Sequence, residues 1–135
     1  MNTNPIDLIL FENCADSAKR FSEAGITSFM IDLEILGKDI RQLGFDTEIR
    51  PGALSDLRSI SSIPGVKTWC RINRFHDHTV AEISAVIDAG ADVILLPMVT
   101  SLAEVQDFLA LIDNRCEKAV MIETPQAAAL ASELN

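Results

Sequence analysis

Basic residues are scarce in this sequence. Its 135 residues include 11 lysines and arginines against 20 aspartates and glutamates, a formal net charge of -9 at pH 7. Proteins that bind phosphate backbones are usually basic, so this balance argues against a nucleic-acid partner. Hydrophobic residues make up 48% of the chain and charged residues 23%, so it can bury a core. Its length suits one domain of ordinary size.

Cysteines are also few, and their spacing excludes two common scaffolds. Cys14, Cys70 and Cys116 are odd in number, far apart and without a Cys-x-x-Cys pair. This pattern argues against a disulfide framework or a zinc knuckle and fits a reducing compartment. The N-terminus lacks a positively charged leader, and no apolar stretch reaches transmembrane length. We therefore expect a cytoplasmic protein that does not bind a membrane.

Five short apolar segments alternate with helical patterns along the chain. Their apolar residues are nearly continuous, as in parallel strands that are buried on both faces. The predicted strands are Asp7–Phe11, Ser28–Glu34, Val66–Asn73, Asp92–Pro97 and Lys118–Thr124. The regular alternation of strand and helix is typical of βαβ units.

The predicted helices have recognisable ends. Thr79 with Glu82, and Ser101 with Glu104, have the spacing of a capping box. Further helices are expected at about 14–24, before Gly25, at about 54–61, and from Thr124-Pro125 onward. The apolar stripes predicted to face the core are Ile83, Val86 and Ile87 in one helix and Leu102, Val105, Leu109 and Ile112 in the next.

Two architectures fit five such units, an open doubly wound sheet and part of an eight-stranded barrel. The glycine-rich turn of a Rossmann fold is missing, because Glu12-Asn13-Cys14 follows the first strand. The barrel is therefore favoured. We expect an α/β fold, a partial TIM-type (β/α)8 barrel of about the first five β/α units with a parallel sheet. Residues 1–135 would be the N-terminal part of a single barrel domain, truncated before closure. The longest connection, Ile35 to Ala53, is rich in charge and glycine, and extended βα loops often carry function.

Polar residues follow three of the predicted strands. Asp32 and Glu34 end the second strand, Arg71 and Asn73 end the third, and Glu123 ends the fifth. Because the carboxyl ends of parallel strands meet at one edge, we expect these side chains on the rim that holds the active site in β/α barrels. Carboxylates hold Mg²⁺ or Mn²⁺, and an arginine binds a carboxylate or a developing enolate. Together they could stabilise an enolate oxygen, as aldol and Claisen chemistry requires.

Structural interpretations of the same residues stay open. Asp32 and Glu123 could be carboxylates at helix N-termini, and Arg71 could neutralise one of them in an ion pair. His76 and His78 form a His-x-His pair in the loop after the third strand. They could bind a metal ion, or they could be exposed loop residues without a specific role. Other residues are expected to pack rather than to take part in chemistry: Trp69 in the core or against a helix, and Met98 and Met121 as gap fillers.

Four motifs occur in order at the ends of the predicted strands: Asp32-Leu33-Glu34, Arg71-Ile72-Asn73, Leu96-Pro97-Met98 and Ile122-Glu123-Thr124. Together they resemble the HpcH/HpaI aldolase and citrate lyase β-subunit family, within the phosphoenolpyruvate/pyruvate barrel superfamily. The resemblance covers essentially the whole chain and includes the segment after the second strand.

The resemblance implies a divalent-metal-dependent lyase that cleaves or forms a C–C bond next to a carbonyl, through an enolate. It implies that Glu123 binds Mg²⁺ or Mn²⁺, that Arg71 and Asn73 bind substrate, and that Asp32 and Glu34 act with Arg71 in catalysis. The substrate would be a small-molecule carboxylate (a 2-oxo acid) or an acyl-CoA. The full-length protein would be a homo-oligomer, as members of the family commonly are.

The sequence also departs from the family at several positions. The second metal carboxylate of the family ends a sixth strand, beyond Asn135. Ile35 replaces an acidic residue of the citrate-lyase-like members, Met121 replaces a glutamine of the pyruvate aldolases, and Arg74 replaces a proline. These departures leave a second hypothesis open, a truncated and non-catalytic barrel fragment that acts as a binding or interaction module.

Overall fold

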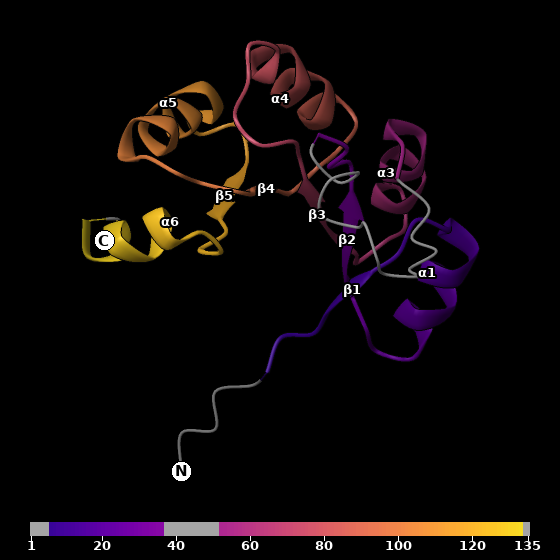
Figure 1. Cartoon of the computed structure of the whole chain (residues 1–135). Helices are drawn as coiled ribbons and strands as arrows, with labels where there is room; N and C mark the ends of the chain where they lie inside the picture. Colours follow the sequence, from indigo (N-terminus) through magenta and orange to yellow (C-terminus); the bar gives the residue numbers. More distant parts are fainter. Residues whose placement is uncertain (1–5, 37–51, 134–135) are drawn as a thin grey trace.

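Five parallel strands alternate with five α-helices in the computed structural model, which describes residues 6–36 and 52–133 (Figure 1). The strands are β1 (Ile9–Phe11), β2 (Ser28–Asp32), β3 (Lys67–Arg71), β4 (Val93–Leu96) and β5 (Glu117–Val120). The helices are α1 (Ala15–Glu23), α3 (Leu54–Ser61), α4 (Thr79–Asp88), α5 (Leu102–Ile112) and α6 (Pro125–Leu130), followed by a 3-10 turn, η1 (Ala131–Glu133). The predicted parallel α/β fold is confirmed.

The strands lie in sequential order, β1-β2-β3-β4-β5, and every neighbouring pair is parallel. This part of the sheet lacks the reversal of order that defines a doubly wound fold. Right-handed crossovers that always advance in one direction place their helices on the same face of the sheet. Figure 1 shows this arrangement, with α1, α3, α4 and α5 along one side of the curving sheet.

The hydrophobic core lies between this face and the helices. Alternate strand residues, among them Phe29, Ile31, Cys70 and Ile94, are completely buried. They pack with buried residues on the inner sides of the helices: Ala18, Leu57, Ile60, Ile83, Val86, Val105, Phe108 and Ile112. The opposite face includes Trp69, which is half-buried; its indole N–H has no hydrogen-bond partner in the part of the chain that is described.

The expectation that all five strands are buried on both faces is wrong for the two edge strands. Phe11 of β1 is 57% exposed, and Glu117 and Lys118 of β5 are exposed as well. An edge strand pairs on one side only, so neighbouring side chains cover it less. β5 also begins one residue earlier than predicted and ends at Val120, so Glu123 lies in the loop after the strand.

Most of the predicted helix ends are confirmed. The first helix ends before Gly25, which adopts a φ of +96°, a conformation that glycine reaches without strain. The helix Leu54–Ser61 has the predicted bounds. Thr124 caps α6, since its hydroxyl accepts a hydrogen bond from the backbone N–H of Ala127 at 2.9 Å, and Pro125 is the first helical residue.

The capping box predicted at Thr79 is wrong. His78 is the N-cap of α4, and the Thr79 hydroxyl accepts a hydrogen bond from the backbone N–H of His76. Glu82 turns away from the helix start and takes part in the rim network described below. The capping box predicted at Ser101 and Glu104 is confirmed for Ser101, whose hydroxyl accepts a hydrogen bond from the backbone N–H of Glu104.

The predicted stripe of α5 is wrong at Leu109, which is 40% exposed, whereas Phe108 is completely buried. Both residues fit a helical period that includes Val105 and Ile112, so the spacing alone does not separate them. The larger aromatic ring takes the core position. The long connection falls at residues 37–51, outside the described residues. None of the helices in the described ranges is long and apolar enough to cross a membrane.

Candidate rim site after the strands

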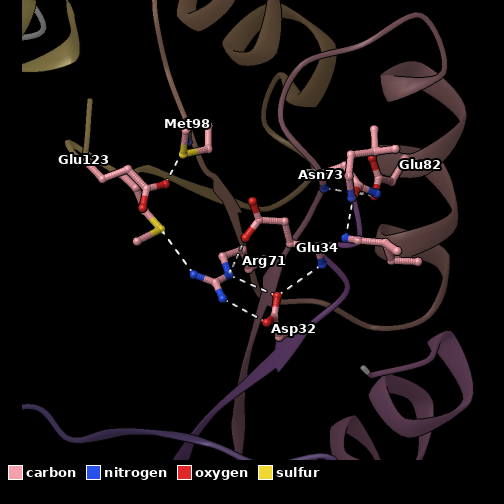
Figure 2. A network of polar contacts seen from close by, with 10 residues as sticks. Asp32, Glu34, Arg71, Asn73, Glu82, Met98 and Glu123 are labelled. Carbon is pink, nitrogen blue, oxygen red and sulfur yellow. Dashed lines mark hydrogen bonds and ion pairs between the residues drawn. The ribbon is translucent and has the colours of Figure 1, made fainter. Parts of the chain in front are cut away.

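Arg71 and Asp32 lie at the centre of the candidate site. They are direct partners in the register of β2 and β3, so their side chains emerge side by side. Arg71 donates two hydrogen bonds to the Asp32 carboxylate, from Nε to Oδ1 at 3.0 Å and from an Nη to Oδ2 at 2.8 Å. This bidentate pair fixes the plane of the guanidinium (Figure 2).

Glu34 adds a second carboxylate to the pair. Its Oε2 lies 3.5 Å from the Arg71 Nε, and its side chain is only 2% exposed. The pKa of Arg71 is raised above its usual value, chiefly by the hydrogen bond with Asp32 and then by the charges of Asp32, Glu34 and Glu123, while burial opposes the rise. Arg71 therefore stays a fixed cation. The sequence prediction that Asp32, Glu34 and Arg71 meet on one rim is confirmed by their positions.

Glu123 lies across the rim, in the loop after β5. Its Oε1 accepts a hydrogen bond from the backbone N–H of Met98 at 2.8 Å. Met98 has a positive φ of 52°, which is uncommon for a residue with a side chain and places it in the turn after β4. The edge of the Arg71 guanidinium that is not bound to Asp32 points toward the Glu123 side of the rim. Its other Nη lies 3.9 Å from the Met121 sulfur (Figure 2).

Asn73 does not join this group. Its amide oxygen accepts hydrogen bonds from the backbone N–H groups of Ile35 and Leu36, at 2.7 and 2.8 Å. Its amide nitrogen donates to Glu82 at 2.7 Å. Because both ends of the amide are bound within the protein, Asn73 fastens the chain after β2 to β3. The geometry gives it a structural role; the substrate binding that the family resemblance implies stays a prediction.

Glu82 is a rim residue that the sequence analysis assigned to another role. Its carboxylate accepts hydrogen bonds from the backbone and side chain of Asn73 and contacts His76 Nε2 at 3.0 Å. The backbone N–H of His78 points to His76 Nδ1 at 3.3 Å, which leaves the ring proton on Nε2, toward Glu82. His76 therefore belongs to the Glu82 network. The capping-box spacing hid Glu82, because a glutamate at that position predicts a local bond.

The two methionines are more than gap fillers. Met98 holds Glu123 through its backbone, and Met121 lies against Arg71 through its sulfur. Only the first contact involves a strong hydrogen bond, and it comes from the main chain. Every residue except proline has a backbone N–H, so the residue type at position 98 does not predict this hydrogen bond.

The described residues do not by themselves form a metal centre. Within 6–36 and 52–133, no group of three or more histidine, cysteine, aspartate or glutamate side chains is placed to hold a metal ion. Asp32 and Glu34 face Arg71. Glu123 is exposed and could contribute one carboxylate to a Mg²⁺ or Mn²⁺ ion.

Comparisons with known proteins yield no family for this chain: no protein-family model matches it, and no curated protein matches it. A functional assignment therefore depends on the residues and geometry of the chain itself.

Proposed function

We propose that this chain forms the substrate-binding side of a divalent-metal-dependent carbon–carbon lyase, which cleaves or forms a bond next to a carbonyl through an enolate. The observation that carries the proposal is the fixed guanidinium of Arg71, held by Asp32 at the carboxyl end of the sheet with Glu34 and Glu123 around it. The residues and their order also resemble the HpcH/HpaI aldolase and citrate lyase β-subunit family.

The charge of this rim supports the metal requirement. One arginine stands among three carboxylates, those of Asp32, Glu34 and Glu123. A divalent cation bound beside Glu123 would offset the excess negative charge, and it would supply Lewis-acid polarisation of the substrate carbonyl. Without such a cation, a negatively charged substrate would meet net repulsion at this edge. In this proposal the other metal ligands come from outside the described residues.

Arg71 has a defined role in the proposed reaction. In the cleavage direction, a base takes the proton of the substrate hydroxyl, and this oxygen becomes the carbonyl of the departing product as the C–C bond breaks. The electron pair of that bond moves onto the other carbonyl to form an enolate, whose carbon then takes up the proton. A cation that is already oriented stabilises that developing charge without reorganising. The bidentate bond to Asp32 holds Arg71 in this orientation, and the edge toward Met121 is the part that a substrate oxygen could reach.

The proposal includes the barrel architecture and the cellular setting. The sequential order of five parallel strands supports this architecture, because a (β/α)8 barrel is built from sequential β/α units with their helices on the outer face. Further strands beyond these five would be needed for closure. Three free cysteines fit a cytoplasmic location. We also propose that the protein is a homo-oligomer and that its substrate is a small-molecule carboxylate or an acyl-CoA.

The test is turnover by the purified protein with Mg²⁺ or Mn²⁺. Release of pyruvate from 4-hydroxy-2-oxo acids, and cleavage of 3-hydroxyacyl-CoA substrates, should be measured with and without EDTA. We expect activity that EDTA removes, and a loss of about a hundredfold or more in kcat/KM for Arg71→Lys, because lysine cannot reproduce the planar fork. A Glu123→Ala variant that keeps full activity would refute the metal role of Glu123.

A second candidate is a non-catalytic binding or interaction module. The observation that favours it is the apolar surface along the β1 edge, where Ile6, Leu8 and Phe11 are 87%, 64% and 57% exposed. Exposed edges and apolar patches favour association. Sedimentation of the protein separates the two candidates when combined with the turnover assay, since a self-associating chain without lyase activity supports the module.

A further inference from the structure

The chain after β2 is held by β3 on either side of Glu34. Before it, the backbone N–H of Leu33 donates to the carbonyl oxygen of Arg71 at 2.9 Å. After it, the next two backbone N–H groups donate to the side-chain oxygen of Asn73, at 2.7 and 2.8 Å. The backbone that carries the Glu34 side chain is therefore anchored at both ends.

The Glu34 side chain meets Arg71 on the rim. Its Oε2 lies 3.5 Å from the Arg71 Nε, and its backbone N–H donates to the Asp32 Oδ1 at 3.1 Å. The same Asp32 oxygen accepts a hydrogen bond from the Arg71 Nε at 3.0 Å. Because the Glu34 side chain is almost completely buried, water screens these charges little, and a shift of its backbone changes the charge close to Nε.

Glu82 decides which way the Asn73 amide points. The Glu82 Oε1 accepts hydrogen bonds from the backbone N–H of Asn73 at 3.1 Å and from its side-chain nitrogen at 2.7 Å. A carboxylate only accepts, so the NH2 end of the amide faces Glu82 and its oxygen faces the chain after β2 (Figure 2). The Glu82 Oε2 in turn contacts His76 Nε2 at 3.0 Å, which holds the carboxylate in place.

We propose that Glu82 is a positioning residue of the rim site: through Asn73 it fixes the segment that carries Glu34, and thereby the charge that surrounds Arg71. The inference rests on the proposed function, since it gives Glu82 a part in holding the cation that stabilises the enolate. Glu82 itself does not touch the substrate. A preorganised cation stabilises developing charge only while its orientation is fixed, so a residue of α4 controls the chemistry at the end of β3.

The Nε–H group of Arg71 reports this positioning directly. Its exchange with solvent is measured by proton–nitrogen correlation NMR of the labelled protein, and its signal is assigned from its absence in Arg71→Lys. The test variants are Glu82→Ala, Glu82→Gln and Asn73→Asp. Asp88→Ala, an exposed change on the same helix, and Ser101→Ala, which removes the cap of the separate helix α5, are the controls.

We expect Glu82→Ala to speed the exchange of the Arg71 Nε–H by roughly three- to tenfold, the factor that corresponds to one lost hydrogen bond. Asn73→Asp should have a similar effect, because two carboxylates that only accept then face each other. Glu82→Gln should keep the wild-type rate, since its amide oxygen still accepts from Asn73. Both controls should exchange as wild type, although Ser101→Ala lowers the stability of the protein.

The path through Glu34 is tested with a double variant. Glu34→Gln removes the charge beside Arg71 and should speed the exchange by itself. The addition of Glu82→Ala to Glu34→Gln should then change the rate little, because both substitutions act through the same carboxylate. Three results would overturn the proposal: a wild-type rate in Glu82→Ala, an undiminished effect of Glu82→Ala in the Glu34→Gln protein, and an equally large effect of Ser101→Ala.

Turnover separates this inference from the proposed function. Glu82→Ala should lower kcat by a similar factor and leave KM nearly unchanged, because the enolate charge develops only in the transition state. Glu82→Gln should retain the wild-type kcat. A wild-type protein without turnover refutes the proposed function, and the exchange rates then decide by themselves whether Glu82 positions Arg71. Wild-type turnover with an unchanged kcat in Glu82→Ala refutes the catalytic importance of that position.

Discussion

Asp32 and Arg71 are cross-strand partners in backbone register and also form a bidentate side-chain pair, with hydrogen bonds of 3.0 and 2.8 Å. The Asp32 side chain is 4% exposed and that of Arg71 18%. The pair therefore joins the carboxyl ends of β2 and β3 in a partly buried environment, where the loss of one partner is costly.

We expect Asp32→Ala to lower the free energy of unfolding by about 2–4 kcal/mol, because it leaves a partly buried guanidinium with weaker compensation. Urea denaturation measures the change. The control is Lys67→Ala, which breaks the exposed pair of Lys67 with Glu117, whose side chains are 42% and 66% exposed. That change should cost less than about 1 kcal/mol. Equal effects of the two substitutions would contradict the special position of Asp32.

Glu82 joins the loop after β3 to α4 through Asn73 and His76. We expect Glu82→Ala to lower the free energy of unfolding by about 1–2 kcal/mol, because it leaves partly buried donors without an acceptor. Glu82→Gln should cost less, since its amide oxygen can still accept from Asn73. Asp88→Ala, an exposed change on the same helix, should stay within about 0.5 kcal/mol. Thermal or urea unfolding that shows no difference between Glu82→Ala and Asp88→Ala would rule out the network as a stabilising feature.

Ser101 caps α5 through its hydroxyl, which accepts from the Glu104 backbone N–H at 3.3 Å. Ser101→Ala should lower the free energy of unfolding by about 1 kcal/mol, the usual value of an N-cap. Ser101→Asp should restore most of it, because aspartate is an equally good cap. Chemical denaturation of the three proteins tests the assignment, and an aspartate variant as unstable as the alanine variant would count against it.

Cys14 is exposed at the N-terminal end of α1. The pKa of its thiol is lowered by the backbone N–H groups at the start of the helix, chiefly that of Ser17. A lower pKa means more thiolate at a given pH, and the thiolate is the form that alkylates. Iodoacetamide should modify Cys14 with a rate that rises at lower pH than in the urea-unfolded chain, as followed by mass spectrometry. A Cys14 rate profile that matches the unfolded chain would refute the shift.

Cys70 should make stability depend on pH in the alkaline range. Burial raises the pKa of its thiol far above the ordinary value. Above about pH 8.5 the unfolded chain releases this proton and the folded chain does not, so unfolding becomes more favourable by about 1.4 kcal/mol per pH unit. Below that pH the contribution is fully present. Urea midpoints measured under reducing conditions should fall more steeply with pH in wild type than in Cys70→Ala.

The local structure was predictable because it depends on neighbouring residues. The helix Leu54–Ser61, the cap at Thr124 and the stop before Gly25 all follow from spacing and residue type. The buried stripe of α5 was predicted only in part, because Leu109 and Phe108 both fit its helical period. Which of the two is buried depends on the strand beneath the helix.

The meeting of Asp32, Glu34 and Arg71 was also predictable, since parallel strands bring their carboxyl ends to one edge. Glu82 was not, because its partners Asn73 and His76 lie six to nine residues earlier in a loop whose path the sequence does not define.

The amino-acid sequence alone determined the parallel α/β alternation and the rim that carries the charged residues. Both follow from short-range periodicity and from the polarity of a strand. Only the tertiary structure decided that Asn73 binds the protein's own backbone, that Met98 holds Glu123, and that Arg74 lines a cavity. These outcomes depend on the exact distances between loops from different β/α units, which arise when the strands pair and the helices pack.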